Sequence, residues 1–432
     1  MTLSEIFSLF QPANGVSIDS RNVPQGALFF AIKGERFDGN QFVEQALANG
    51  AAFAILDDPT RVINESCILV EDTLLTLQQL ARMYRDTFSI PVIGLTGSNG
   101  KTTNKELLTA VLAQKFKVHA TVGNLNNHLG VPLTLLAMPQ DTEIAVIEMG
   151  ANHQQEIADL CTICAPTHGF ITNIGKAHLE GFGGMEGVQK GKGELFDFLK
   201  NTQGSAFINS DLLTISNMAE ERHLTKIITY NKQSCPLQLL DHNPFIRFQL
   251  ENTVYTSPIG GSYNFDNMLT AFTIGTYFGV AATQAAQALA AYQPKNHRSQ
   301  IIERGTNSIL MDAYNANPSS MQAAISHFLQ IETPKKKALI LGDMFELGED
   351  SAHEHAEIGR QLKNADVEWI ALYGENMHYA LPYLPKAYYF TDKFSLHNWL
   401  IDKNLDNYFI LVKGSRGVGL ESILSVLPSS ER

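Results

Sequence analysis

The chain reads IPVIGLT at residues 90–96 and GSNGKTT at residues 97–103. The first run is apolar and rich in β-branched residues, which predicts a buried strand. Gly97 and Gly100 permit a tight turn, and from Thr102 onward the apolar side chains recur with helical spacing. The stretch therefore predicts a strand, a turn and a helix, in that order.

A turn of this kind can hold phosphate. Unpaired N–H groups and the helix dipole at a helix start attract phosphate oxygens, Lys101 adds a mobile positive charge, and Thr102 offers a hydroxyl to Mg²⁺. This is the mechanism of a P-loop, although Leu95 stands where the usual pattern has its first glycine. A chance Gly-Lys-Thr turn on the surface is the alternative, and the flanking strand and helix argue against it.

The whole chain has the composition of a globular protein, with 432 residues, 44% hydrophobic content and a formal net charge of −12. The length suggests two or three domains. The negative charge argues against general binding of nucleic acid or of membrane surfaces, so phosphate binding must be local. Because no long apolar run and no secretory signature are present, we expect a cytoplasmic protein without membrane insertion. Four cysteines are too few for a disulfide framework, and we expect Cys161 and Cys164 to be buried apolar residues rather than a metal or redox pair.

Residues 1 to about 80 predict a small mixed unit, with strands at 27–32 and 52–56 around a helix near 42–49. Arg21 and Lys33 stand beside small hydroxyl and glycine residues, a combination that can hold a diphosphate. Solvated loop residues are the alternative interpretation. A helix from Thr73 to about Phe88 then leads into the phosphate-loop strand.

Two further buried strands are predicted at 143–148 and 169–172. The first ends in Glu148, and the second runs into a loop that contains His178. Because ligands collect at the carboxyl ends of parallel strands, we expect both side chains to face the same crevice as Lys101. A carboxylate there supplies the hard oxygen ligand that Mg²⁺ needs, whereas a structural role is the alternative for a single histidine.

Other polar groups leave two interpretations open. The amides of Asn124, Asn126 and Asn127 suit a sugar, a phosphate or a metal-bound water, and they equally suit turn capping. Asn264 and Asn267 are one helical turn apart and could read a purine edge, with helix capping by Asn264 as the alternative. Residues 187–196 predict a helix start that carries two lysines, for which a solvated basic face is the simplest interpretation.

A linker is predicted around residues 292–298, and beyond it strands at 308–312, 337–341, 368–373 and 408–412 alternate with helices. The fold class is therefore α/β with three domains. We expect a small mixed N-terminal domain at 1–83, a central P-loop ATPase-type domain with a parallel sheet at 84–295, and a Rossmann-like C-terminal domain at 296–432. The last domain carries polar strand ends at 312–318, 342–348 and 413–416, where such sheets bind ligands.

Several blocks in this order resemble the Mur ligase family of peptidoglycan synthesis: TGSNGKTT, NLNNHLGVPLTLL, IEMG, NIGKAHLEGFG, KGKGELF, GSYNFDNMLTA, DAYNANPSSM, LGDMFELGE and VKGSRGVGLE, with DSR and FDGNQF in the first unit. The resemblance implies a monomeric ATP-dependent amide-bond ligase that uses two Mg²⁺ ions. Its implied substrates are UDP-N-acetylmuramoyl-tripeptide and D-alanyl-D-alanine. Phosphorylation of the terminal carboxylate gives an acyl phosphate, which removes a negative charge and supplies a leaving group.

The resemblance also implies residue roles. Catalytic roles fall to Lys101, which holds the β- and γ-phosphates, to His178, and to Lys192, which matches a lysine carbamylated in relatives. The implied metal ligands are Thr102, Glu148, His178 and Lys192. The implied nucleotide-binding residues are Gly97, Ser98, Asn99, Gly100, Lys101, Thr102, Thr103, Asn264, Asn267, Arg298 and Asp312. The implied substrate-binding residues are Ser20, Arg21, Lys33, Asp38, Asn124, Asn126, Asn127, Lys413, Ser415 and Arg416, and Asn40 stands where relatives often have histidine.

Three alternatives are weighed against this function. A sibling ligase that adds the third amino acid is disfavoured because no Asp-Asn-Pro-Arg block is found, and a folylpolyglutamate synthase because the N-terminal DSR unit has no place in it. A P-loop NTPase that acts as a conformational switch would need neither the N-terminal unit nor the polar strand ends of the third sheet.

Overall fold

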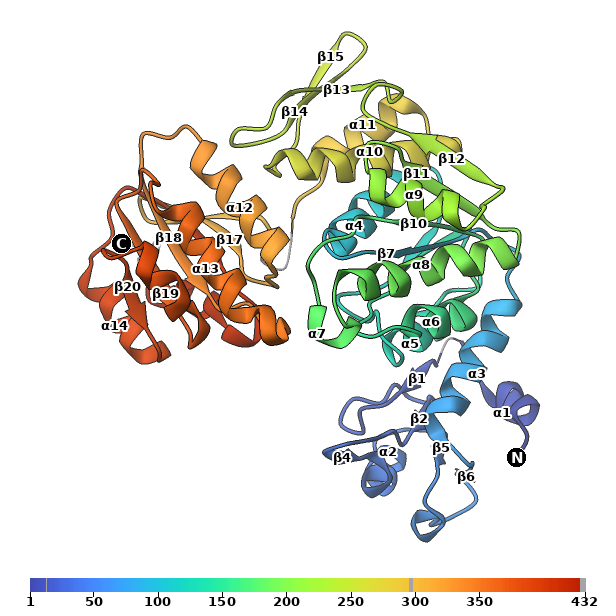
Figure 1. The fold of residues 1–432 in the computed structure, drawn as a ribbon. Coiled ribbons are helices and arrows are strands. Elements are labelled where there is room, and N and C mark those ends of the chain that lie inside the picture. Colours follow the sequence, from blue (N-terminus) through green and yellow to red (C-terminus); the bar gives the residue numbers. More distant parts are fainter. Residues whose placement is uncertain (13, 295–297, 428–432) are drawn as a thin grey trace. The chain divides into compact units, whose positions relative to one another are not determined.

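The computed structural model describes residues 1–12, 14–294 and 298–427, and its elements are shown along the chain in Figure 1. Two compact units are formed. The first comprises Met1–Gly97, Leu112–Thr172 and Lys190–Thr229, and the second comprises Ser98–Val111, Asn173–Gln189 and Tyr230–Arg432. The predicted linker and the predicted boundary at 295/296 fall partly on residues 295–297, which lie outside the described residues.

The N-terminal part of the first unit is built on a parallel four-stranded sheet of order β1-β2-β5-β6. Phe29, Ala54 and Leu56 on this sheet pack against Val43 and Ala46 of α2, which forms the local core. Both predicted strands and the predicted helix are present. The elements are α1 (Leu3–Leu9), β1 (Val16–Ser17), β2 (Leu28–Phe30), β3 (Lys33–Gly34), β4 (Phe37–Asp38), α2 (Val43–Ala48), β5 (Phe53–Leu56), β6 (Cys67–Leu69) and α3 (Thr73–Asp86).

A second sheet in the first unit has six strands in the order β12-β11-β10-β7-β9-β8. Strand β7 is buried along its whole length and pairs in parallel with β9 and β10, as the apolar pattern predicts. The strands are β7 (Val92–Thr96), β8 (Val118–Ala120), β9 (Ile144–Glu148), β10 (His168–Ile171), β11 (Ser205–Asn209) and β12 (Ile227–Tyr230). The helices near it in sequence are α4 (Lys101–Leu112), α5 (Gly130–Leu136), α6 (Glu156–Cys164), α7 (Leu179–Phe182), α8 (Met185–Asn201) and α9 (Leu213–Glu221).

The C-x-x-C pair lies on α6 and serves packing. Cys161 and Cys164 are both buried, and each sulfur lies 3.7 Å from the sulfur of Met149. Burial raises the pKa of the Cys164 thiol to about 12. The expectation of buried apolar cysteines is confirmed.

From Tyr230 onward, the second unit consists of a small antiparallel sheet, the helices α10 and α11, and a large sheet with its own helices. The small sheet consists of β13 (Leu237–Asp241), β14 (Arg247–Leu250) and β15 (Thr253–Thr256), and it is followed by α10 (Ser262–Tyr277) and α11 (Ala282–Ala291). The large sheet has the order β16-β17-β21-β18-β19-β20, in which only β16 is antiparallel to its neighbour among the described strands. Its elements are β16 (Gln300–Arg304), β17 (Asn307–Asp312), α12 (Pro318–Gln330), β18 (Lys336–Gly342), α13 (Ser351–Leu362), β19 (Trp369–Tyr373), β20 (Tyr388–Phe390), α14 (Lys393–Asp402) and β21 (Tyr408–Lys413).

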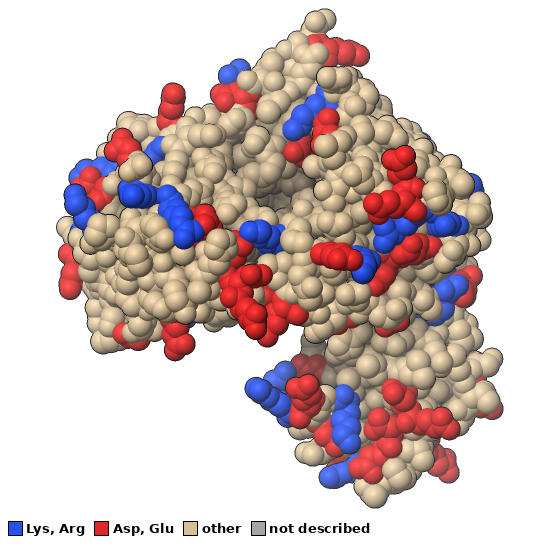
Figure 2. Space-filling model, in the orientation of Figure 1, with Lys and Arg blue, Asp and Glu red and all other residues tan. Residues whose placement is uncertain are grey.

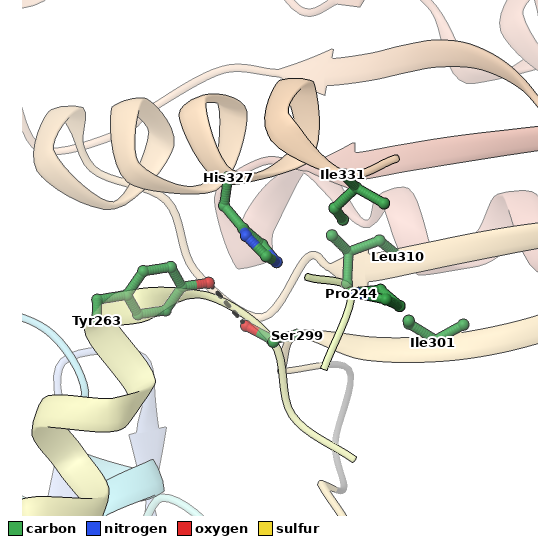
Figure 3. A pocket seen from close by; sticks show the side chains of 8 residues that line it. Pro244, Tyr263, Ser299, Ile301, Leu310, His327 and Ile331 are labelled. Atoms are coloured by element: carbon green, nitrogen blue, oxygen red, sulfur yellow. Dashed lines mark hydrogen bonds between the residues drawn. The ribbon is translucent and has the colours of Figure 1, made fainter. Parts of the chain in front are cut away.

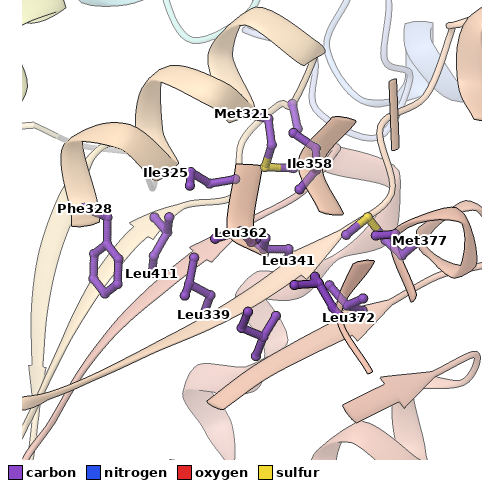
Figure 4. Close-up of a cluster of buried hydrophobic side chains, with 14 of the residues drawn as sticks. Met321, Ile325, Phe328, Leu339, Leu341, Ile358, Leu362, Leu372, Met377 and Leu411 are labelled. Carbon is purple, nitrogen blue, oxygen red and sulfur yellow. The ribbon is translucent and has the colours of Figure 1, made fainter. Parts of the chain in front are cut away.

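Helices cover both faces of this large sheet. On one face Phe328 and Met321 of α12 and Ile358 of α13 pack on Leu339 and Leu411, a cluster shown in Figure 4. On the other face α14 contributes Leu396 and Leu400 to a second cluster. The α/β fold class with parallel sheets is confirmed, including a nucleotide-fold type sheet at the C-terminal end of the chain.

Candidate functional site

The carboxyl ends of β7, β9 and β10 lie at the same end of the six-stranded sheet in the first unit. Leu95 pairs with Glu148 on one side of β7, and Thr96 pairs with Ile171 on the other. Glu148 is the last residue of β9 and is 1% exposed. Asn126 donates its amide N–H to Glu148 Oε1 at 2.7 Å, so the structure brings together two residues that the sequence assigned to different ligands.

Glycine is required at two positions of the loop that follows β7. Gly97 has φ +146°, and a Cβ added there would lie 2.0 Å from the Thr172 hydroxyl. Gly100 has φ +75°, and α4 begins at the next residue, Lys101. Beside this loop the Thr96 hydroxyl is buried and has no hydrogen-bond partner among the described residues. These features fit a ligand that presents anionic oxygen atoms, such as a phosphate, at the start of α4.

The shape of this loop is fixed by the segment that follows β10. The Ser98 hydroxyl donates to the Gly175 carbonyl at 3.0 Å and accepts from the Gly175 N–H at 2.9 Å. Asn99 and Asn173 exchange two bonds of 3.0 Å each. The Ser98 hydroxyl and the Asn99 backbone therefore shape the loop, whereas Oδ1 of the Asn99 side chain accepts from the Asn317 amide at 2.7 Å.

Lys101, Thr102 and Thr103 form the first turn of α4. Thr102 is buried, and Lys101 is partly buried with its ammonium donating to the Ser98 carbonyl at 3.3 Å. Lys101 is the first residue of α4, where the helix dipole and the backbone N–H groups favour a bound anion.

A chain of amides connects this loop with α10, and sequence reasoning missed its first member. Asn104 is 1% exposed and donates both to the Gly100 carbonyl at 3.0 Å and to Asn267 Oδ1 at 2.7 Å. Asn267 donates to Asn264 at 2.9 Å, and Asn264 donates to the Gly260 carbonyl at 2.7 Å. The N-cap of α10 is Gly261, so Asn264 does not occupy the capping position. An asparagine in the first turn after a glycine-rich loop was the available signal, because asparagine is not a favoured helix residue.

His178 precedes α7 with a left-handed φ of 54°. Its Nδ1 pairs with the Glu346 carboxylate, which lies in the loop after β18 within the same unit. Sequence reasoning did not assign Glu346, although it belongs to the quoted LGDMFELGE block. A carboxylate on one ring nitrogen fixes the orientation of the imidazole.

The two lysines in the N-terminal half of α8 differ in burial. Lys190 is exposed, whereas Lys192 is fully buried and donates to the Ala151 carbonyl at 2.9 Å. A solvated basic face therefore describes Lys190 and is wrong for Lys192. A buried lysine at a candidate site needs a functional or structural partner.

In the C-terminal sheet, Asp312 and Lys413 end neighbouring strands and form an ion pair of 2.6 Å. Lys413 is 2% exposed and also donates to the Asn315 carbonyl at 3.2 Å. The Ser415 hydroxyl donates to the Ala316 carbonyl and accepts from the Phe345 N–H. The contacts of Lys413 and Ser415 therefore connect the chain after β21 with the loops that follow β17 and β18. Arg416, in contrast, is exposed.

In the N-terminal part, the predicted diphosphate residues differ in exposure. Ser20 is buried and donates to Gln45, whereas Arg21 and Lys33 are exposed. Arg21 pairs with Asp19 at 2.8 Å, and its guanidinium lowers the pKa of that carboxyl to about 2. Asn40 is buried between Asp38 and Asp57, to which it donates bonds of 2.8 Å.

In the loop that carries Asn124, Asn126 and Asn127, some side chains make turn-capping contacts and others do not. Asn127 accepts from the Gly130 N–H at 2.8 Å at the start of α5, which is a turn-capping contact. Asn126 contacts Glu148, and Asn124 is exposed. Only part of the loop therefore has its side chains occupied by local capping.

Among the described residues, no group of three or more His, Cys, Asp and Glu side chains is arranged to hold a metal ion. Glu148 and Lys192 belong to the first unit, and Lys101, Thr102 and His178 belong to the second. Oxygen is the ligand atom that Mg²⁺ prefers, and among these residues the Glu148 carboxylate and the Thr102 hydroxyl offer it.

A small pocket lies within the second unit beside the start of α10, and Figure 3 shows the side chains around it. Tyr263 and Ser299 are joined across it by a hydrogen bond of 3.3 Å. The lining residues are Pro244, Gly260, Tyr263, Ser299, Ile301, Leu310, His327 and Ile331. The lining includes no residue of the predicted site.

Basic side chains on the face shown in Figure 2 are interspersed with acidic ones rather than gathered into one patch. The helices of the described residues are all too short or too polar to cross a membrane.

Three family models match consecutive parts of the chain: the Mur ligase family catalytic domain at 12–85, the Mur ligase middle domain at 95–275, and the Mur ligase glutamate ligase domain at 297–416. The chain belongs to the Mur ligase family. A curated member, the UDP-N-acetylmuramoyl-tripeptide--D-alanyl-D-alanine ligase of Bacillus subtilis, is 38% identical over 428 residues, which is 96% of this chain and 93% of the relative.

Solved structures of the Mur ligase family agree with the fold. A crystal structure of MurF from Acinetobacter baumannii has a TM-score of 0.86 at 33% identity and covers 95% of this chain and 92% of its own. MurF ligase from Thermotoga maritima in complex with ADP has a TM-score of 0.82 at 29% identity, with 96% and 97% covered. The resemblance read from the sequence blocks is confirmed.

Proposed function

We propose that this Mur ligase uses ATP to add D-alanyl-D-alanine to UDP-N-acetylmuramoyl-tripeptide in peptidoglycan precursor synthesis. The observation that carries the proposal is the 38% identity to the Bacillus subtilis ligase of that name across nearly the whole of both chains. The glycine loop and Lys101 at the end of the buried central strand supply the phosphate chemistry that such a ligase needs.

The reaction requires activation of a carboxylate. A carboxylate at neutral pH is a poor electrophile, so transfer of the γ-phosphoryl group of ATP to it gives an acyl phosphate with a good leaving group. The amine of the dipeptide then attacks the acyl carbon, and phosphate leaves. In this scheme Lys101 binds the β- and γ-phosphates, and the N–H groups at the start of α4 hold their oxygens.

We assign Mg²⁺ to Thr102, Glu148, His178 and Lys192, with two ions in the complete site. The ions would neutralise phosphate charge during transfer. Lys192 fits this set if it is carbamylated, because the modification converts an ammonium into a carboxylate-like ligand. Its burial and its separation from the exposed Lys190 support Lys192 as the modified residue.

The remaining roles follow from the matched blocks and from exposure. We assign the adenine edge to Asn264 and Asn267, and further nucleotide contacts to Arg298 and Asp312. The uridine-diphosphate end is assigned to Ser20, Arg21, Lys33 and Asp38, the muramoyl end to Asn124, Asn126 and Asn127, and the dipeptide end to the segment of Lys413, Ser415 and Arg416. We propose three domains with bounds 1–83, 84–295 and 296–432, and a cytoplasmic monomer.

The experiment is measurement of ADP release with purified protein, ATP and Mg²⁺. We expect release to require UDP-N-acetylmuramoyl-tripeptide and D-alanyl-D-alanine together. Release at an equal rate with neither substrate would favour an NTPase that acts as a conformational switch. Release with a single amino acid in place of the dipeptide, on a UDP-muramoyl-dipeptide, would favour the sibling ligase that adds the third residue.

A further inference from the structure

Two arginines contact the same aromatic ring in the second unit. The guanidinium carbon of Arg298 lies 3.6 Å from the centroid of the Tyr314 ring, and that of Arg416 lies 5.2 Å from it. Arg416 also donates to the Tyr314 hydroxyl at 3.4 Å. The three residues come from three different places in the chain: before β16, after β17 and after β21.

Two like charges beside one ring repel each other, so other interactions must offset the repulsion. The negative face of an aromatic ring attracts each guanidinium and offsets part of the repulsion. Asp312 lies two residues before Tyr314, but its carboxylate already pairs with Lys413. Arg298 Nε is buried and has no hydrogen-bond partner among the described residues. An anionic oxygen is a strong acceptor for such a group.

We propose that Tyr314 is a positioning residue that holds Arg298 and Arg416 together as a pair for anionic groups of two different substrates. This rests on the proposed function, in which Arg298 contacts the nucleotide and Arg416 lies at the dipeptide end. Arg298 then binds a phosphate oxygen, and Arg416 binds the carboxylate of the dipeptide. Because both guanidiniums stack on one ring, loss of that ring disturbs both binding sites at once.

The test compares Tyr314→Leu, which removes the ring, with Tyr314→Phe, which keeps it and removes the hydroxyl. The measurement is the steady-state KM for ATP and for D-alanyl-D-alanine. Arg298 makes a partly buried cation–π contact and Arg416 an exposed one, so we expect Tyr314→Leu to raise both KM values about threefold to tenfold, with a smaller change in kcat. Tyr314→Phe should stay within about twofold of the parent for both substrates.

A matched control is Tyr383→Leu, because Arg360 lies 4.8 Å from the Tyr383 ring on another part of the same unit. This variant removes an arginine–tyrosine stack and should leave both KM values unchanged. Unfolding midpoints of all variants are compared, and Tyr314→Met serves as a second aliphatic replacement if Tyr314→Leu does not fold.

The inference is overturned if the aliphatic variants leave either KM at the parental value, or if Tyr314→Phe is as impaired as Tyr314→Leu. The first result would show that the ring does not couple the two sites. The second would assign the effect to the hydroxyl group. An inactive parent protein would instead count against the proposed function, so the two failures are distinguishable.

Discussion

Lys101 begins the helix that follows the buried strand β7, and Lys413 is the last residue of the buried strand β21, yet the two lysines are held differently. Lys101 is partly buried and donates to a neutral carbonyl beside a loop of glycines. Lys413 is 2% exposed and pairs at 2.6 Å with the carboxylate of Asp312. Because the Lys413 ion pair is buried, loss of either partner destabilises the fold, whereas Lys101 begins a helix, where the N–H groups and the dipole favour a bound anion.

The largest expected effect concerns the buried ion pair of Asp312 and Lys413. Asp312→Asn leaves the Lys413 ammonium buried without its carboxylate, and removing one partner of a buried pair typically costs about 3–5 kcal/mol of stability. We expect the free energy of unfolding, measured by urea titration, to fall by that order. The double variant Asp312→Asn with Lys413→Met should recover part of the loss because it removes the buried charge. A single variant as stable as the parent would contradict this account of Lys413.

A second effect on the C-terminal part depends on pH. His327 lies on α12 beside the pocket of Figure 3, and burial, with a smaller contribution from His242, lowers its pKa to about 4. The unfolded chain binds this proton near pH 6.5, so between pH 6.5 and 4 the unfolded state holds more protons than the folded state. Stability should therefore fall as pH decreases through this window, by up to about 3 kcal/mol for this residue.

The measurement is urea unfolding at intervals from pH 7 to pH 4. His327→Gln should reduce the slope of the free energy of unfolding against pH in this range. His353→Gln replaces a histidine whose side chain is 61% exposed and should keep the parental slope. An unchanged slope in His327→Gln would show that other groups control the acid sensitivity.

The third effect concerns the lysine beside the glycine loop. Lys101→Ala removes a positive charge directed at the transferring phosphoryl group, which we expect to reduce turnover about a hundredfold or more. The measurement is steady-state turnover, with the unfolding midpoint recorded for the same variant. A large loss of stability with normal turnover would show that Lys101 stabilises the fold, as Lys413 does, and does not serve a bound anion.

The lysines of α8 give a matched pair for the next effect. Lys192→Ala should lower activity about tenfold to a hundredfold if Lys192 is a metal-supporting group, whereas Lys190→Ala should be neutral. After incubation with bicarbonate, the intact mass of the parent should rise by one carbamate and that of Lys192→Ala should not. Equal activity of Lys192→Ala and the parent would remove the assigned role.

Much of the fold could be predicted from the sequence, because the central strands of both large sheets are continuous apolar runs. Strand β7 was expected at 90–96 and spans Val92–Thr96, and β21 was expected at 408–412 and spans Tyr408–Lys413. The edge strands β16 and β20 and the helix α9 were not predicted. Both edge strands are partly exposed, and β20 has only three residues, so they lack the continuous apolar signal of β7.

The candidate site was predictable only where the chemistry lies in one continuous motif. The loop from Gly97 to Lys101 could be identified because its glycines, its lysine and its helix start are adjacent in the chain. The pairs Asn126 with Glu148, His178 with Glu346, and Arg298 with Tyr314 join residues that are far apart in sequence. Spacing carries no information on such partners, so they required the structure.

The smallest expected effect concerns Asn104, the missed residue beside the phosphate loop. Its amide joins the Gly100 carbonyl to Asn267, so Asn104→Ala leaves two buried acceptors without their donor. We expect the KM for ATP to rise about tenfold, because a lost buried hydrogen bond typically costs about 1–3 kcal/mol. The KM for D-alanyl-D-alanine should not change, since neither acceptor belongs to the residues assigned to the dipeptide.

Thr109→Val is the control, because Thr109 donates to the Lys105 carbonyl one turn further along α4. It removes a helix hydrogen bond without reaching the loop or α10, and its KM for ATP should match the parent's. Asn104→Asp sharpens the test, because an aspartate of the same shape places a carboxylate against two carbonyl oxygens and should impair ATP binding more than alanine does. If alanine and aspartate at position 104 both keep the parental KM, the phosphate loop is held by Ser98 and Asn99 alone.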